Sequence, residues 1–170
     1  MTLVIETGSG GATAQAYAGA TAYAAWALLV YGETVTATTA DQEAAILRAV
    51  RFMDGLSWYG QQTFGRAQGL AWPRAYVTDK DGWSVGSTEI PPEVIEAQHL
   101  FTRAELATPG SLAPSVTLAG GKTLIAVGSL QWKANAAPNT VDASRPVITA
   151  AMDVLSGLIR SRATGYVERA

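Results

Sequence analysis

Apolar residues recur with helical spacing in the middle of the first half of the chain. Ile46, Val50 and Met53 fall at positions i, i+4 and i+7, which places them on one face of an amphipathic helix. The preceding Thr39-Ala40-Asp41-Gln42 has the form of a capping box, in which threonine and glutamine side chains satisfy free backbone N–H groups. Gly55 is a typical C-terminal residue. The pattern therefore predicts a helix that begins at the capping box and ends before Gly55.

Three further helices are expected. The first covers Ala14 to Tyr31, an alanine- and tyrosine-rich segment that Gly32 would end. Another opens at Pro91-Pro92, since proline costs little in the first helical turn. A last helix is expected near Ser144-Arg145-Pro146. The inward-facing positions of the last two helices are Val94, Ala97, Phe101 and Ala104, and then Ile148, Ala151, Met152, Leu155, Leu158 and Ile159.

The remaining segments favour extended structure. Leu3-Val4-Ile5 predicts a short strand or arm, and no helical period survives between Leu56 and Glu89. A tight β-turn is expected at 77–85, with Gly82 supplying positive φ. Two runs of β-forming residues on either side of Gly120-Gly121 predict a β-hairpin.

These elements predict a mainly α fold, a small bundle of about four helices with a β-hairpin and short extended segments. Residues 1–143 are expected to form a helical core that carries the hairpin, around 115–134, and an N-terminal arm. Residues 144–170 are expected to form a C-terminal helix and tail that serve in docking.

The composition favours some classes of protein function over others. Charged residues make up 15% of the 170 residues and apolar residues 48%, whereas soluble domains average about 25% charged. This deficit favours a subunit that buries surface in an assembly. A net charge of −2 and a pI near 5.3 argue against a dedicated nucleic-acid binder, which needs excess Lys and Arg. The uncharged stretch 12–31 is too weakly apolar for a membrane span, and a buried or interface helix is the better interpretation.

No catalytic, metal or cofactor site is predicted. The chain has no cysteine and one histidine, His99, so zinc sites and Cys-His triads cannot be assembled in one copy. A surface or packed role is expected for His99. Gly120-Gly121-Lys122-Thr123 imitates the end of a phosphate-binding loop, but Val116 replaces its first glycine. Asp79 and Asp81 resemble the start of a calcium loop that lacks its final glutamate, so a plain turn is expected. We expect a protein that is not an enzyme.

The segment Gly69-Leu70-Ala71-Trp72-Pro73-Arg74 combines an indole, a proline and a cation. Pro73 fixes its own φ and pushes Trp72 into an extended conformation. Trp72 then plugs the gap between helices, and Arg74 stacks on an aromatic ring or pairs with an acid. The alternative is a tryptophan–arginine hot spot on a partner surface. The core plug is the favoured interpretation because large aromatics dominate burial.

Several of these motifs occur together in a known family. The order is an extended arm, an Ala/Tyr-rich helix, the helix EAAILRAVRFMD, the motif Ala71-Trp72-Pro73-Arg74, an Asp-x-Asp-Gly turn and IPPEV at 90–94. With this order the chain resembles a tailed-phage family whose members are often labelled DnaT-like single-stranded-DNA-binding proteins. Members of that family also resemble head–tail adaptor, or head completion, proteins of phages and gene transfer agents.

The resemblance to adaptors implies a structural virion protein in the neck, present in the host cytoplasm during assembly. Such subunits form a homo-oligomeric ring, commonly of about twelve copies, beneath the portal protein. The ring extends the DNA channel, which DNA passes without specific binding, and meets a stopper or tail-completion protein. No membrane and no cofactor are implied. The portal-docking role falls on the C-terminal helix, with Leu155, Leu158, Ile159, Arg160 and Arg162 as candidate contacts.

The alternative is a replication accessory protein that binds single-stranded DNA. It would need a basic groove with stacking aromatics. Five aromatic and three basic residues of one segment could supply them: Trp58, Tyr59, Trp72, Tyr76 and Trp83, with Arg66, Arg74 and Lys80.

Overall fold

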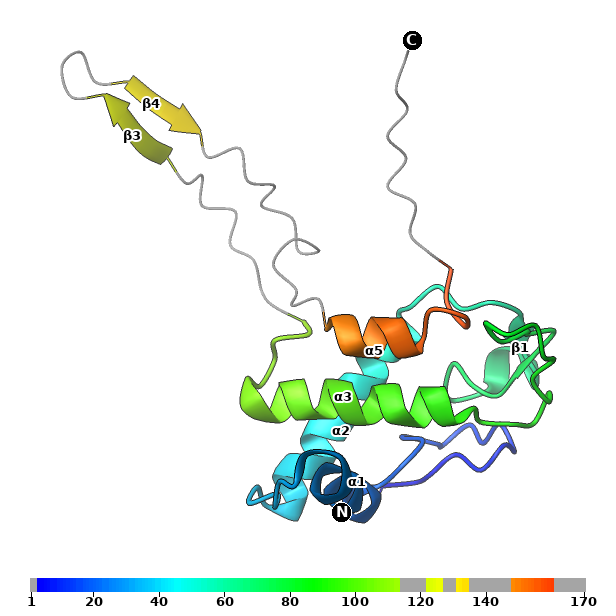
Figure 1. The fold of residues 1–170 in the computed structure, drawn as a ribbon. Helices are drawn as coiled ribbons and strands as arrows, with labels where there is room; N and C mark the ends of the chain where they lie inside the picture. The colour runs from blue at the N-terminus through cyan, green and yellow to red at the C-terminus, as the bar shows by residue number, and fades with distance from the viewer. Residues whose placement is uncertain (1–2, 114–121, 127–130, 135–147, 161–170) are drawn as a thin grey trace, which may run out of the picture.

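The architecture comes from a computed structural model, which describes residues 3–113, 122–126, 131–134 and 148–160. Within them lie four α-helices: α1 (Ala20–Tyr31), α2 (Thr39–Asp54), α3 (Pro92–Ala107) and α5 (Thr149–Val154). In Figure 1, α3 lies between α1 and α5, and α2 crosses behind it. The fold is mainly helical with a small antiparallel hairpin, as the apolar pattern predicts.

The core forms where α2, α3 and α5 meet. The predicted inward positions Ile46, Val50 and Met53 of α2 are each 2% exposed or less. From α3, Val94, Ala97 and Phe101 are equally buried, whereas the fourth predicted position, Ala104, is half-buried. Ala151 and Leu155 of the α5 region close the core from the other side. The helical periods in the sequence therefore identify most of this core correctly.

The first helix starts six residues later than its pattern predicts. Residues 14–18 are extended, and Ile5 forms a parallel bridge with Ala16. Gln98 of α3 is fully buried, and its side-chain oxygen accepts hydrogen bonds from the backbone nitrogens of Tyr17 (2.8 Å) and Ala18 (3.2 Å). Alanine-rich sequence favours helix locally, but these long-range bonds hold the segment extended. The predicted end is correct, since Gly32 has φ 67°.

The cap of α2 lies one residue before the predicted one. The N-cap is Thr38, whose side-chain oxygen accepts a hydrogen bond from the backbone nitrogen of Asp41 (3.2 Å). Gln42 does not complete a capping box, because its side-chain nitrogen donates to the carbonyl of Ala37 (2.8 Å). The helix ends at Asp54, before Gly55, as expected.

A buried carboxylate closes the C-terminal end of α3. Glu105 is fully buried and accepts hydrogen bonds from Arg48 Nε (2.6 Å) and from the backbone nitrogens of Gly110 (2.7 Å) and Leu112 (2.8 Å). Burial raises the pKa of Glu105, but these donors outweigh it and hold the pKa below its ordinary value. Glu105 thereby fixes the turn that follows α3.

Residues 56–90 form an irregular lobe at the α2 C-terminus. It contains the two-residue strands β1 (Gln61–Gln62) and β2 (Arg74–Ala75), which pair antiparallel, and a 3₁₀ turn at Gly65–Ala67. Thr78 pairs with Ser84 around the predicted turn, where Gly82 has φ 91°. The lobe therefore carries short extended segments and turns, as the loss of helical period predicts.

The hairpin is present, with a different turn from the predicted one. Strands β3 (Lys122–Ala126) and β4 (Gln131–Ala134) pair antiparallel, with Leu124 opposite Trp132. The connection therefore falls at 127–130, and Gly120-Gly121 precede β3. The prediction of a turn at the glycine pair is therefore wrong, because both paired strands lie in the β-forming run after Gly121. Gly120 and Gly121 lie outside the described residues. So do residues 144–147 and 161–170 of the predicted docking segment.

No α-helix in the described part of the chain has both the length and the apolar character needed to cross a membrane. The alanine-rich segment considered above contributes α1, which has 12 residues.

Candidate nucleic-acid interface

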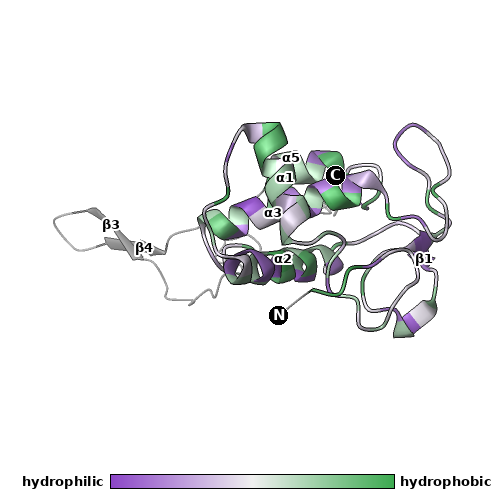
Figure 2. Cartoon of the chain, turned by 90° about the horizontal axis from the view of Figure 1, so that it is seen from below, coloured by the Kyte–Doolittle hydropathy of each residue, from purple (hydrophilic) through white to green (hydrophobic). Residues whose placement is uncertain are grey.

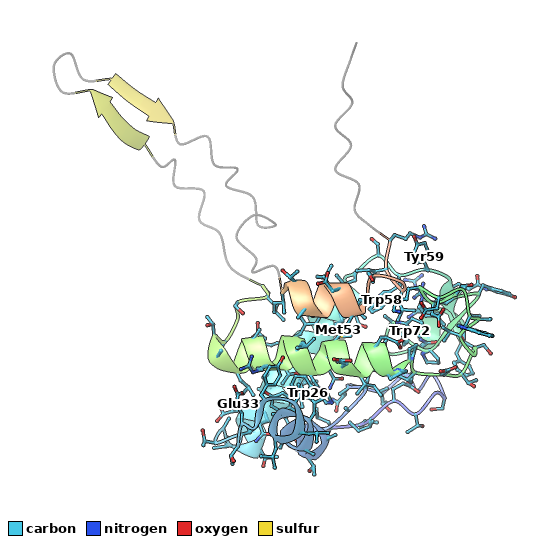
Figure 3. The ribbon with its side chains drawn as sticks, in the orientation of Figure 1. Trp26, Glu33, Met53, Trp58, Tyr59 and Trp72 are labelled. Atoms are coloured by element: carbon cyan, nitrogen blue, oxygen red, sulfur yellow. The ribbon has the colours of Figure 1, made fainter. Side chains whose placement is uncertain are left out.

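Trp72 lies at the centre of the lobe. Its side chain is fully buried and meets Trp58 edge to face, with ring centroids 5.7 Å apart and an interplanar angle of 89°. Trp58 is fixed by its indole nitrogen, which donates to the carbonyl of Met53 (2.9 Å). The peptide bond between Trp72 and Pro73 is cis. Burial of Trp72 confirms the predicted core plug, and Figure 3 places both indoles beside Met53.

The backbone of the motif is held from two sides. Asp54, the last residue of α2, accepts a hydrogen bond at Oδ1 from the nitrogen of Ala71 (2.8 Å). The hydroxyl of Tyr17 accepts one from the nitrogen of Trp72 (3.2 Å). Burial raises the pKa of Asp54, although the bond from Ala71 opposes this. Burial, followed by the nearby charge of Asp54, raises the pKa of Tyr17 well above its ordinary value. The motif is thereby anchored to α2 and to the N-terminal segment.

Arg74 acts as a backbone clamp. Its guanidinium donates to the carbonyls of Tyr59 (2.7 Å), Ala71 (3.1 Å) and Gly60 (2.8 Å). The prediction that Arg74 stacks on a ring or pairs with an acid is therefore wrong. Three carbonyls converge on the side chain, and burial lowers its pKa. The clamp fixes the path of residues 59 and 60.

Three aromatic rings project from this fixed frame into solvent. Tyr59 is 43% exposed, Tyr76 84% and Trp83 75%. Tyr76 has φ 60°, and it is the one non-glycine residue in the described chain with positive φ. Such a backbone costs about 1–2 kcal/mol, and persistent strain of this kind clusters at functional sites. The guanidinium of Arg160 lies 5.7 Å from the centroid of the Tyr59 ring. Figure 3 shows Tyr59 at the outer edge of the lobe.

The turn that carries Trp83 is held by its own aspartate. Asp79 Oδ1 accepts hydrogen bonds from the nitrogens of Asp81 (2.9 Å) and Trp83 (2.8 Å). Lys80 pairs with Asp81 (3.0 Å) in an exposed ion pair. This geometry agrees with the plain turn that the sequence predicts. It also leaves Lys80 beside a carboxylate, so Lys80 contributes little net positive charge to the lobe.

A pocket of about 330 Å³ opens beside the clamp, between the end of α2 and the tryptophan–proline motif. Its lining includes Asp54, Trp58, Gln62, Leu70, Ala71 and Arg74. Gln62 donates its side-chain nitrogen to the carbonyl of Leu70 (2.9 Å). The pocket therefore combines an indole wall with a carboxylate, an amide and a guanidinium.

The other end of the molecule carries a second aromatic cluster. His99 is 4% exposed, and its ring lies 5.2 Å from that of Trp26 and 5.8 Å from that of Tyr23. This packed position is one of the two expected for His99, and burial lowers its pKa to about 4. Arg103 lies over the Tyr31 ring (4.1 Å). Figure 3 shows Trp26 here, on the side of α1.

The outer surface of α1 is apolar. The helix has no charged residue, and Leu28, Leu29 and Val30 are 57%, 86% and 52% exposed. In Figure 2, part of α1 has the colour of hydrophobic positions. A helix that is apolar on all sides is normally buried. The structure leaves this face of α1 uncovered by the described residues.

The five predicted portal contacts separate into two groups. Leu155 and Leu158 are 2% exposed or less and pack in the core of this chain, so their side chains are not free for a partner. Ile159 is half-buried and Arg160 is exposed. Arg162 lies outside the described residues. The predicted helix is shorter than its apolar pattern, since α5 ends at Val154, and Leu155 and Leu158 follow it as part of the core of this chain.

The family model described as "Putative DnaT-like ssDNA binding protein" matches residues 1–170. The chain belongs to this family. No curated protein matches it, and no solved structure does. The resemblance drawn from the sequence is therefore confirmed for the DnaT-like family, and the match provides no support for the head–tail adaptor.

Sequence reasoning grouped five aromatics of the lobe as possible stacking residues. The structure separates them, because Trp58 and Trp72 are buried whereas Tyr59, Tyr76 and Trp83 are exposed. Tyr76 was recognisable only as one member of this aromatic group. Its positive φ could not be read from residue type, since tyrosine rarely adopts that conformation.

Proposed function

We propose that this DnaT-like protein binds single-stranded DNA by stacking bases on Tyr59, Tyr76 and Trp83. The observation that carries the proposal is that these rings are 43%, 84% and 75% exposed on one lobe. The Arg74 clamp holds the backbone of Tyr59, and the Asp79 turn holds that of Trp83. Stacking of a base on an aromatic ring is worth about 1–3 kcal/mol and depends little on sequence.

The few free positive charges near the rings indicate that stacking contributes more to binding than contacts with phosphates do. Residues 1–113 carry eleven acidic and six basic side chains. Of the basic groups near the rings, Arg74 is engaged with carbonyls and Lys80 with Asp81. Arg66 and Arg160 have no hydrogen bond or ion pair from their side chains to the described residues, and both are exposed. Two phosphate contacts would give a log–log salt slope of roughly −1.4.

A fluorescence anisotropy titration with labelled oligo(dT) tests the proposal. We expect Tyr76→Ala and Trp83→Ala each to weaken binding about 5- to 150-fold, the range that the loss of one stacked base gives. Leu29→Ala is the control, because Leu29 is 86% exposed on α1 and its loss also removes apolar surface. Equal affinities of all four proteins, or no binding by the wild type at low salt, would contradict the proposal.

A second candidate is the head–tail adaptor, and the surface of α1 favours it. Leu28, Leu29 and Val30 form an uncharged, exposed face of the kind that neighbouring subunits cover. In this role the chain would form a ring under a portal protein, with residues 144–170 docking and a stopper or tail-completion protein on the other side. An acidic body would let DNA pass without holding it. The protein would then reside in the virion neck.

The adaptor candidate is tested by particle mass and electron microscopy, with and without a portal protein. We expect ring-sized particles for the wild type and their loss in Leu29→Asp, since a charge on the apolar face opposes burial. Ser57→Asp introduces the same charge on an exposed residue outside α1 and should still assemble. Monomers under all conditions, with no association with the portal, would contradict this candidate.

A further inference from the structure

The pocket beside the clamp has the size and position for one base of a bound strand. Its volume of about 330 Å³ is at the lower end of the 300–1,000 Å³ range of ligand pockets. Trp58, which lines it, directly precedes the exposed ring of Tyr59. Arg74 joins the two, because it binds the carbonyl of Tyr59 and lines the pocket, so a strand stacked on Tyr59 passes beside the pocket.

Hydrogen-bond acceptors face this pocket without partners. Asp54 uses Oδ1 to accept from Ala71, and its Oδ2 has no hydrogen bond to any described residue. Gln62 donates its nitrogen to the carbonyl of Leu70, and its oxygen likewise has no partner among the described residues. A carboxylate oxygen pairs most strongly with a ligand that offers N–H donors, because such bonds are charge-assisted.

Arg74 supplies hydrogen-bond donors to the same pocket. Arg74 has five N–H groups and uses three of them for the carbonyls of Tyr59, Gly60 and Ala71. Two N–H groups of a guanidinium that lines the pocket therefore remain for a ligand oxygen. The pocket presents acceptors from Asp54 and Gln62 and donors from Arg74.

We infer that this pocket receives a guanine base, with Asp54 accepting from its N1–H and N2 amino group and Arg74 donating to its O6. The inference rests on the proposed function. Guanine alone among the four bases places two adjacent donors beside an acceptor on its Watson–Crick edge, the edge that proteins read in unpaired strands. Thymine and cytosine offer one donor group each beside carbonyl acceptors, and adenine offers no oxygen for Arg74. Trp58 lines the pocket and is 6% exposed, so the base meets only the exposed edge of this residue.

The test compares single-base variants of one oligonucleotide. Fluorescence anisotropy is measured for the full chain at pH 7.5 with dT12 and with dT12 in which one central base is dG, dA or dC. We expect the dG oligonucleotide to bind about tenfold tighter than dT12, because well-placed hydrogen bonds to one base edge are worth about 1–3 kcal/mol of discrimination. Binding of dGMP against dAMP is measured in parallel to separate a base in a strand from a free nucleotide.

Asp54→Asn is the decisive variant. Asparagine retains an oxygen for the nitrogen of Ala71 but replaces the free acceptor with a donor, so the preference for dG over dT should disappear. Asp81→Asn removes the same charge from an exposed turn residue whose side chain contacts Lys80, and it should keep the preference. Thermal unfolding of both variants confirms that each is folded.

The outcomes separate the two proposals. Preference for dG that is lost in Asp54→Asn and kept in Asp81→Asn supports the guanine pocket, and selective binding of dGMP supports it independently of the strand. Binding of all four oligonucleotides with equal affinity overturns the pocket and leaves the stacking function intact. Absence of binding to every oligonucleotide and to dGMP overturns both.

Discussion

Gln98 and Ala18 exchange two hydrogen bonds across 80 positions of sequence. The side-chain oxygen of Gln98 accepts from the nitrogen of Ala18 (3.2 Å), and its nitrogen donates to the carbonyl of Ala18 (2.8 Å). The same oxygen also accepts from the nitrogen of Tyr17 (2.8 Å). A fully buried amide in the middle of α3 therefore supplies the hydrogen-bond partners of residues 17 and 18, directly after the bridge between Ile5 and Ala16.

Replacement of Gln98 by leucine should strongly destabilise the fold. The change leaves three buried backbone groups without partners, and each unsatisfied group costs about 1–3 kcal/mol. We expect the free energy of unfolding, measured by urea denaturation, to fall by about 3 kcal/mol or more. Gln61→Leu is the matched control, because Gln61 is exposed in β1. A loss below about 1 kcal/mol for Gln98→Leu would show that water replaces the amide.

The same contact explains where sequence reasoning fails for the first helix. Residues 14–19 have the alanine-rich composition of the helix that follows, so local propensity gives no reason to stop. The extension is imposed by Gln98 and by the bridge between Ile5 and Ala16, which are long-range. By contrast, α2 and α3 follow their patterns closely because one amphipathic face of each meets one core.

Gly69 is a contact point between the motif and the N-terminal loop. A Cβ atom at this position would lie 2.7 Å from the carbonyl oxygen of Gly11 and 3.0 Å from that of Ala12. We expect Gly69→Ala to lower the free energy of unfolding by about 2 kcal/mol, as overpacking against backbone does. Gly19→Ala is the control, since its nearest contact would be the side chain of Ile5 at 3.7 Å. Equal melting temperatures of the two variants would contradict this expectation.

The buried His99 should make the fold sensitive to acid. Burial lowers its pKa to about 4, whereas the unfolded chain titrates near its ordinary value of about 6.5. Between these values the unfolded state binds more protons, so stability decreases as pH falls. We expect wild-type protein to lose about 1–2 kcal/mol between pH 7 and pH 5 relative to His99→Phe, measured by urea denaturation at each pH. Parallel pH profiles of the two proteins would contradict a neutral buried imidazole.

Burial of the tryptophan in the motif could be predicted, and the role of its arginine could not. An indole beside a proline in an apolar chain favours the core, and Trp72 is fully buried. Arg74 finds three carbonyls that belong to a chain path fixed by tertiary structure. The pocket depends on the same path, because Asp54 ends a helix while Gln62 comes from a strand. No local pattern brings these residues together.

Tyr76 offers a test in which stability and binding move in opposite directions. Its backbone at φ 60° is strained for tyrosine but unstrained for glycine, and the ring is 84% exposed and makes little packing contact. We expect Tyr76→Gly to raise the free energy of unfolding by about 0.5–1 kcal/mol, because relief of about 1–2 kcal/mol of strain exceeds the added entropy of the unfolded chain. The same variant should bind oligo(dT) about 5- to 150-fold more weakly than wild type. Trp83→Gly is the control: its φ is not positive, so it should weaken binding without gaining stability. A Tyr76→Gly protein that is more stable and binds DNA as well as wild type would leave the strain without the functional role proposed here.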